Sequence, residues 1–410
     1  MDQLLRSHAD QIIKASITAV LPDEAVKRAL EGQNFPGRVL LVSAGKAAWQ
    51  MAKAAYDFWG DKIENGVVVT KYDHVMGPIG NFQCFEAGHP VPDENSFKGT
   101  QAALDLVGDL TEQDTVLFLL SGGGSALFEK PLVPGEVLQD VTGQLLACGA
   151  DIVEINIIRK RLSAVKGGRF AQHCAPAQVF SIVLSDILGD PLDMIASGPA
   201  VPDTATKEQA IAIAKKYELK MPDYAWELLE QETPKELSNV TTQINGSVKE
   251  LCVAAAAACR ELGYEPIMLT DQLCCQAKEA GSFLASVLKT HAGGGKKLAF
   301  LAGGETVVHL TGKGKGGRNQ ELALAAAVGI DGITGAAVFS VGSDGTDGPT
   351  DAAGGYVDYT TAGELKARGV EIFEVLKQND AFHALQKVGG LVYTGPTGTN
   401  VNDVAVALLG

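Results

Sequence analysis

The sequence predicts an α/β protein of two domains, the first of which is built around a Rossmann-like parallel sheet. The chain has 410 residues, more than one hydrophobic core usually organises. From residue 39 to about residue 217, short apolar runs alternate with helical segments, the pattern of successive βαβ units. Glycine bounds most of these runs, as is typical of buried strands in parallel sheets.

The same patterns predict the other elements of the first domain. Residues 2–31 predict one or two amphipathic helices, because charged residues recur throughout this stretch, unlike in a signal peptide. Residues 32–37 and the proline-rich segment 87–93 predict loops. Pro222 and Pro234 break helices, and an Asn- and Thr-rich stretch follows them. We therefore expect domains at 1–240 and 241–410, with the last segment free to pack back on the first domain.

The second domain is expected to begin with a helix over residues 248–262 and a strand at 266–269. A helix over residues 277–291 and a strand from Leu298 should follow. Glycines then precede a helix that runs from about residue 316 to Ala327. At such a helix start, free backbone N–H groups and the positive end of the helix dipole face outward, which favours an anion site.

Composition excludes several classes of protein. A net charge of −15 argues against a nucleic-acid partner, which requires a basic surface. No uncharged apolar run reaches the ~18 residues that span a membrane, so we expect a cytoplasmic protein without a membrane partner. The seven cysteines show no metal-type spacing and are expected to be reduced and structural. A homodimer is compatible with the sequence, which does not fix the oligomeric state.

Polar residues follow five of the predicted strands. Ligands bind at the carboxyl ends of strands in open α/β sheets, so five such ends predict a single polar cleft. The last of these loops, residues 342–355, carries three carboxylates among glycines, and carboxylates are the oxygen ligands that Mg²⁺ prefers. Its alternative interpretation is a plain surface turn, since Asp and Gly are turn formers. The small and polar residues at the five ends are Ser43, Gly45 and Lys46; Ser121 to Ser125; Asp186 and Asp190; Glu305; and Asp344, Asp347 and Asp351.

Two clusters of basic residues stand out against the acidic composition. One covers residues 159–169 and includes Arg159 and Lys166, and the other covers residues 313–318 and ends at Arg318. Cations at glycine-rich turns favour binding of a small anion. The alternative is a solvated charged helix face, which suits Lys160 and Arg161.

The known nucleotide motifs are absent. A dinucleotide fingerprint needs G-x-G-x-x-G after a strand, but the first strand is followed by Gly45 alone. This absence argues against the alternative of an NAD(P)H-dependent hydroxypyruvate reductase. Walker A, protein-kinase and G-x-S-x-G patterns are also missing. Phosphoryl transfer requires cations, a metal and a group that positions or deprotonates the acceptor. Lys46, Arg318 and the loop carboxylates supply this inventory, whereas a non-catalytic phosphosugar sensor would need fewer carboxylates.

Long stretches of the chain resemble the class II glycerate 2-kinases, a family with a MOFRL domain at its C-terminal end that is sometimes labelled hydroxypyruvate reductase. The resemblance spans nearly the whole sequence. It rests on residues 43–47, 86–93, 121–126, 155–169, 184–190, 196–199, 303–305, 317–321, 344–354 and 395–403.

The resemblance implies two α/β domains, the second of MOFRL type, with the active site in an inter-domain cleft. It implies phosphorylation of D-glycerate to 2-phosphoglycerate with ATP as co-substrate and Mg²⁺ as cofactor. Lys46 and Arg318 are the implied catalytic cations, and Asp186 and Asp351 are candidate catalytic carboxylates. Asp190, Asp344 and Asp347 are candidate metal ligands, although sequence does not separate base from metal ligand. The candidate substrate- and phosphate-binding residues are Ser43, Gly45, His89, Ser121, Gly122, Gly123, Gly124, Ser125, Arg159, Lys166, Glu305, Asn319, Glu321, Asn400 and Asn402.

Overall fold

The computed structural model describes residues 1–410, which form two compact units. The N-terminal unit comprises Pro22–Asn245, and the C-terminal unit comprises Met1–Leu21 together with Gly246–Gly410. Helix α1 (Gln3–Ala19) belongs to the C-terminal unit because it packs against α11 (Val248–Glu261). The sequence places this helix with the first domain, since an amphipathic pattern shows that one face is buried but not which unit covers it.

The N-terminal unit contains the expected Rossmann-like layer. Its six-stranded sheet has the order β3-β2-β1-β4-β5-β6, and the pairs from β3 to β5 are all parallel. The carboxyl ends of these strands therefore share one edge. The strands are β1 (Val39–Ala44), β2 (Ile63–Lys71), β3 (Gln83–Ala87), β4 (Thr115–Leu120), β5 (Gln178–Leu184) and β6 (Val240–Gly246).

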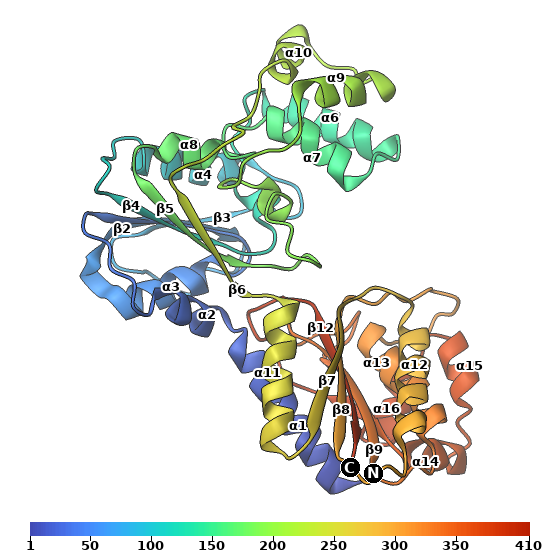
Figure 1. Cartoon of the computed structure of the whole chain (residues 1–410). Helices are drawn as coiled ribbons and strands as arrows, with labels where there is room; N and C mark the ends of the chain where they lie inside the picture. The colour runs from blue at the N-terminus through green and yellow to red at the C-terminus, as the bar shows by residue number, and fades with distance from the viewer. The chain divides into compact units, whose positions relative to one another are not determined.

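Helices cover both faces of this sheet (Figure 1). Alternation along β1 sends Leu41 into the core beneath α2 (Pro22–Leu30) and α3 (Ala48–Trp59), and Val42 into the opposite core. That second core lies beneath α4 (Glu94–Leu106) and α8 (Arg169–Cys174). Its centre holds three packed rings, with Phe118 and Phe170 centroids 4.7 Å apart and Phe128 beside both. Burial of each such ring contributes about 1.5–3 kcal/mol.

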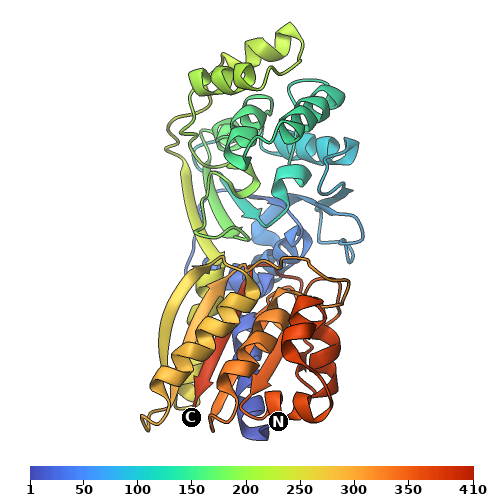
Figure 2. The ribbon, with the colours of Figure 1, turned by 90° about the vertical axis from the view of Figure 1, so that its right-hand side faces the viewer.

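A helical layer with its own apolar core extends the N-terminal unit (Figure 2). It joins two helices from the β4–β5 connection to two from the β5–β6 connection, and Leu145, Ile158, Ala214 and Leu229 are all buried in it. These helices are α6 (Gly135–Ala147), α7 (Ile152–Arg161), α9 (Lys207–Lys216) and α10 (Asp223–Leu229). The short elements of this unit are η1 (Gly60–Lys62), α5 (Gly124–Leu127) and η2 (Ile195–Ser197).

The C-terminal unit is built on a mixed sheet of order β11-β10-β9-β12-β8-β7. β12 lies between β8 and β9 and is antiparallel to both, which makes this sheet mixed. β8 and β9 still point the same way, and their carboxyl ends meet the start of β12. The strands are β7 (Glu265–Leu273), β8 (Leu298–Gly304), β9 (Ala336–Gly342), β10 (Gly354–Asp358), β11 (Leu391–Val392) and β12 (Asp403–Leu409).

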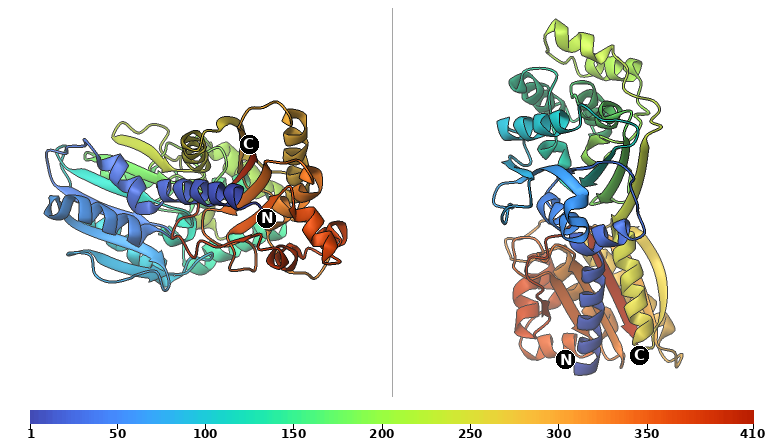
Figure 3. Two further views of the ribbon diagram at one scale, coloured as in Figure 1. Left: turned by 90° about the horizontal axis from the view of Figure 1, so that it is seen from below. Right: turned by 90° about the vertical axis from the view of Figure 1, so that its left-hand side faces the viewer.

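Two helical layers enclose the mixed sheet. α1 and α11 lie on one face, as the right-hand view of Figure 3 shows, and the remaining helices cover the other (Figure 2). α12 and α13 pack closely because Gly281 has no side chain, since a Cβ there would lie 2.1 Å from the Leu322 carbonyl oxygen. These helices are α12 (Ala277–His291), α13 (Arg318–Ile330), α14 (Thr361–Ala367), α15 (Ile372–Lys377) and α16 (Ala381–Lys387). No helix in either unit has the length and apolar character required to cross a bilayer.

Candidate active site

The turn after β1 holds Lys46 at the carboxyl edge of the parallel sheet. Gly45 adopts φ +124°, and a Cβ there would lie 2.2 Å from the Ser121 Oγ, so only glycine fits. The Lys46 N–H donates to the Gly122 carbonyl at 2.8 Å, and the Thr70 hydroxyl donates to the Lys46 carbonyl at 3.2 Å. These bonds fix the Lys46 backbone between the ends of β2 and β4.

Two of the predicted binding serines hold this turn together. The buried Ser43 hydroxyl donates to the Ala48 carbonyl at 2.8 Å. The buried Ser121 Oγ accepts the Ala47 N–H at 3.0 Å. The geometry therefore favours a supporting role for both hydroxyls.

The three glycines after Ser121 lie where other predicted residues converge. A Cβ on Gly122 would lie 2.2 Å from the Asp186 Oδ2. A Cβ on Gly123, whose φ is +85°, would lie 3.1 Å from both the His89 Nε2 and the Lys46 Cγ. Gly124 instead faces protein, since its Cβ would lie 2.6 Å from the Ala196 Cβ. Glycine is therefore required at positions 122 and 123 so that the side chains of Asp186, His89 and Lys46 can approach one stretch of backbone.

His89 experiences two positive charges at this edge. Desolvation lowers the pKa of His89, and the charges of Lys46 and then Lys71 lower it further. Lys71 is the last residue of β2, next to the β1 end that carries Lys46. Two cations beside an imidazole whose protonation is disfavoured suit a site that receives an anion, and the sequence argument does not include Lys71 among its candidates.

The cationic groups of Arg159 and Lys166 are directed into the protein. Both donate to the Ser125 carbonyl, each at 2.9 Å, and Lys166 also donates to the Phe128 carbonyl at 3.1 Å. The Lys166 Nζ lies 3.2 Å from a fully buried Glu129 carboxylate, and Arg159 lies 3.7 Å from it. Burial lowers the pKa of Lys166 to about 8, against the opposing effect of Glu129. Both residues thus support the segment that follows the glycines.

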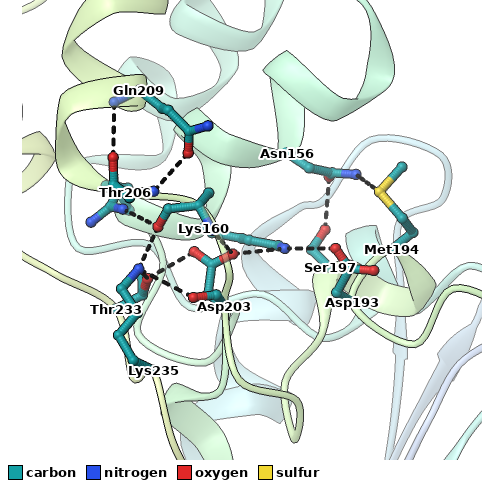
Figure 4. A network of polar contacts seen from close by, with 12 residues as sticks. Asn156, Lys160, Asp193, Met194, Ser197, Asp203, Thr206, Gln209, Thr233 and Lys235 are labelled. Atoms are coloured by element: carbon teal, nitrogen blue, oxygen red, sulfur yellow. Dashed lines mark hydrogen bonds and ion pairs between the residues drawn. The ribbon is translucent and has the colours of Figure 1, made fainter.

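The rest of this basic segment is buried as well. Lys160 pairs with Asp203 at 3.1 Å and with Asp193 at 3.6 Å, in the network that Figure 4 shows. Arg161, with no exposed side-chain surface, donates to the carbonyls of Gln231 and Ala205. A solvated helix face is therefore wrong for Lys160 and Arg161. The hydrogen-bond partners Asp203 and Ala205 lie more than forty residues away in sequence, beyond the reach of local pattern.

Asp190 follows β5 with an unusual backbone. Its φ is +52°, and a non-glycine residue in the left-handed region costs about 1 kcal/mol or more. Its Oδ1 is buried without a hydrogen-bond partner. Such an oxygen would be satisfied by a ligand hydroxyl or a cation.

In the C-terminal unit, Arg318 begins α13 and binds two carboxylates. Its Nε and Nη2 contact the Asp403 carboxylate at 2.5 and 3.0 Å, and its Nη1 contacts the Glu305 Oε1 at 2.7 Å. Burial alone would lower the pKa of Arg318, but the hydrogen bonds and negative charge of Asp403 more than offset this effect and raise the pKa of Arg318. Burial raises the pKa of Asp403 despite the opposing Arg318. Arg318 remains partly exposed, with 31% of its side-chain surface accessible.

Asp347 caps the same helix. Its Oδ1 accepts the Asn319 N–H at 3.1 Å and the Asn319 side-chain amide at 3.3 Å, while its Oδ2 accepts the Gln320 N–H at 2.8 Å. Burial raises the pKa of Asp347 to about 7, although these N–H donors act in the opposite direction. Both oxygens are occupied, so the geometry favours a helix cap over a metal ligand.

The other predicted residues of this unit vary in accessibility. Asp344 accepts the Thr346 N–H at 2.9 Å, whereas Asp351 is exposed and accepts no hydrogen bond. Asn400 is exposed, and its Oδ1 accepts the Asn402 N–H at 3.4 Å. Glu321 is buried beside the Asn379 amide at 3.3 Å, and burial raises its pKa.

A metal site is not preformed by protein side chains alone. The structure gathers no group of three or more His, Cys, Asp or Glu side chains that could hold an ion. Mg²⁺ usually binds through one or two carboxylates plus substrate phosphates and water. Asp190 and Asp344 each retain a carboxylate oxygen without a protein donor, which suits such sparse coordination.

Comparisons with known proteins cover both units. A family model described as "Domain of unknown function (DUF4147)" matches residues 8–230, and the MOFRL family matches residues 298–403. A D-glycerate 2-kinase of Thermotoga maritima is 54% identical over 99% of this chain and 98% of its own. The chain belongs to the class II glycerate kinase family. A glycerate 2-kinase of Pyrococcus horikoshii is 40% identical over 97% of this chain and 96% of its own.

A solved structure supports the same membership. The crystal structure of a glycerate kinase from Thermotoga maritima superposes with a TM-score of 0.95, at 52% identity, and covers 100% of both chains. In this class II glycerate kinase chain, sequence reasoning missed Lys71, Glu129, Asn156, Ser197 and Asp403 as site or supporting residues. Asp403 had a usable signal, because it directly follows the 395–402 loop and begins a final apolar run. No local sequence signal identifies Glu129, because its partners Arg159 and Lys166 are distant in sequence.

Proposed function

We propose that the protein is an ATP-dependent D-glycerate 2-kinase. The observation that carries this proposal is the convergence of Lys46, His89 and Asp186 on consecutive glycines at the carboxyl ends of parallel strands. Full-length similarity to a D-glycerate 2-kinase supports the same reaction. In that reaction the glycerate 2-hydroxyl oxygen bonds to the γ-phosphorus of ATP, the bond from that phosphorus to the bridging oxygen breaks, and the hydroxyl proton is lost.

Lys46 and Arg318 supply positive charge to the transferring group in this proposal. Little covalent chemistry is required in phosphoryl transfer, so catalysis depends on position and charge. Lys46 has a fixed backbone and a side chain beside Gly123, and Arg318 has a guanidinium oriented by Asp403 and Glu305. We infer that both cations act in the same reaction.

Asp186 is the carboxylate that we assign as proton acceptor. It lies against Gly122, in the same group as Lys46 and His89. Asp351 is exposed and lacks positioning contacts, so we rank it second. A base must lie within hydrogen-bond reach of the proton it removes, which favours the carboxylate next to the glycine-rich backbone.

Mg²⁺ would be held by nucleotide phosphates together with Asp190 or Asp344. When bound, it neutralises charge on the phosphates and orients them. We assign Asp347 to the helix cap, with Asn319 as its partner. The exposed Glu305 and Asn400 would contact ligand directly, whereas the buried Glu321 would hold Asn379 against helix α13 and the buried Asn402 would shape its loop.

A coupled assay tests this function. Purified protein with D-glycerate, ATP and Mg²⁺ should release ADP, and NMR of the product should place the phosphate on carbon 2. Hydroxypyruvate should not drive NADH or NADPH oxidation. Turnover of NADH, or ligand binding without ADP release, would replace the proposal with a reductase or a sensor, respectively.

A further inference from the structure

A chain of hydrogen bonds runs from Met194 to Ser125 beside the glycine-rich segment. The Asn156 Nδ2 donates to the Met194 Sδ at 3.7 Å, and the Ser197 hydroxyl donates to the Asn156 Oδ1 at 3.0 Å. The Ser125 and Ser197 oxygens lie 3.2 Å apart. Figure 4 shows Asn156 between Met194 and Ser197. Ser125 is partly exposed, whereas Asn156 and Ser197 are buried.

The chemistry of Met194 fixes the direction of this chain. A thioether has no hydrogen to donate, so we assign the Asn156 amide with its NH₂ group toward Met194 and its oxygen toward Ser197. Ser197 then uses its only hydroxyl hydrogen on Asn156. The hydrogen between the two serines must therefore come from Ser125. The Ser125 oxygen retains free lone pairs but has no hydrogen left for a ligand.

Ser125 is also fixed through its backbone. Its carbonyl accepts hydrogen bonds from Arg159 and Lys166, both at 2.9 Å. The facing turn has Ala196 at φ +49° and Ser197 at φ +62°, and such left-handed residues are strained outside glycine. Strain of this kind persists only where the surroundings enforce it, often at functional sites. Ser125 is therefore held as a preoriented hydrogen-bond acceptor.

We propose that Ser125 is a specificity-determining residue that accepts a hydrogen bond from the substrate hydroxyl that does not receive the phosphoryl group. This inference rests on the proposed function. An acceptor without a hydrogen gives no hydrogen bond to a carboxylate or phosphate oxygen, so the ligand group that Ser125 contacts must be a hydrogen-bond donor. The substrate hydroxyl that receives the phosphoryl group must lose its proton, and a neutral serine hydroxyl is a poor base compared with Asp186. We therefore assign the hydrogen bond of Ser125 to the second hydroxyl of a 2,3-dihydroxy acid. An acid without that hydroxyl would leave the Ser125 acceptor unpaired.

Calorimetry without nucleotide tests this inference. The dissociation constants of D-glycerate and D-lactate, which lacks the second hydroxyl, are compared in the wild-type protein, Ser125→Ala, Ser197→Ala and the control Ser282→Ala. Ser282 is an exposed serine on α12 that donates to the Lys278 carbonyl. We expect wild type and Ser282→Ala to prefer glycerate by about 10-fold or more.

Ser125→Ala should lower this preference by about 10-fold, through weaker glycerate binding with lactate binding nearly unchanged. Ser197→Ala should lower it in the same direction, because the Ser125 hydrogen becomes free to turn toward the ligand. An unchanged preference in Ser125→Ala, equal weakening of both acids, or binding of neither acid by the wild-type protein would overturn the inference. Failure to release ADP in the kinase assay would instead reject only the proposed reaction, since the binding comparison does not require turnover.

Discussion

Replacement of Lys166 by methionine tests whether this buried cation supports the fold or contacts ligand. Lys166→Met removes two carbonyl hydrogen bonds and the ion pair with Glu129 at 3.2 Å. Glu129 would then be fully buried with only Arg159, 3.7 Å away, as a charged neighbour. Breaking a buried pair on one side costs about 3–5 kcal/mol. The three contacts share one ammonium group, so their separate energies are not summed.

The assay is equilibrium unfolding in guanidinium chloride, followed by tryptophan fluorescence. All three tryptophans, Trp49, Trp59 and Trp226, lie in the N-terminal unit, so the signal reports the unit that contains Lys166. We expect Lys166→Met to lose about 3–5 kcal/mol. The double variant Glu129→Gln/Lys166→Met should recover part of this loss, because the fully buried Glu129 carboxylate no longer remains without its lysine partner.

The opposite pattern would refute this reasoning. If Lys166→Met unfolds within about 0.5 kcal/mol of wild type while activity disappears, Lys166 contacts the ligand and is not a buried support. A double variant less stable than Lys166→Met would show that Glu129 is stabilised by partners other than Lys166.

Two further predictions concern one unit each. Gly122→Ala places a Cβ 2.2 Å from the Asp186 Oδ2, so the Asp186 carboxylate must move. We expect kcat to fall at least ~10-fold, while the free energy of unfolding followed by tryptophan fluorescence changes by less than about 2 kcal/mol. A wild-type kcat in this variant would show that Asp186 has no role in the mechanism. The Asp347 carboxyl keeps its proton up to about pH 7 in the folded protein, whereas in the unfolded chain it ionises near pH ~4. Its contribution to stability is therefore present below about pH 4 and is lost as the pH rises to 7. The melting temperature measured by circular dichroism should decline less between pH 4.5 and 7.5 in Asp347→Asn than in wild type. An equal decline in both proteins would contradict the raised pKa of Asp347.

Local sequence pattern predicted the strand ends well. A strand followed by glycine needs only neighbouring residues to be recognised, and Gly45 and Gly122 lie at the sheet edge as expected. Charge partners could not be predicted in this way. Lys160 looks solvent-exposed from its own helix, and only the fold brings Asp203 to it from forty-three residues away.

The same limit explains the grouping of elements. The apolar pattern of α1 shows a buried face, but its partner α11 begins more than 200 residues later. The final run at residues 403–409 is recognisable as apolar, yet nothing local shows that it inserts antiparallel between β8 and β9. Asp403 reaches Arg318 only through that insertion, which is why it was missed.

The most direct test of the central claim measures kcat for Lys46→Ala, Arg318→Ala and the double variant with D-glycerate, ATP and Mg²⁺. Cationic groups of this kind contribute roughly 10³- to 10⁵-fold in phosphoryl transfer. We expect each single variant to lose activity on this scale and the double variant to be little worse than either, because residues that act as a unit are non-additive. Wild-type kcat in either single variant, or a double-variant loss equal to the product of the two single losses, would contradict joint action of the two cations on one phosphoryl transfer.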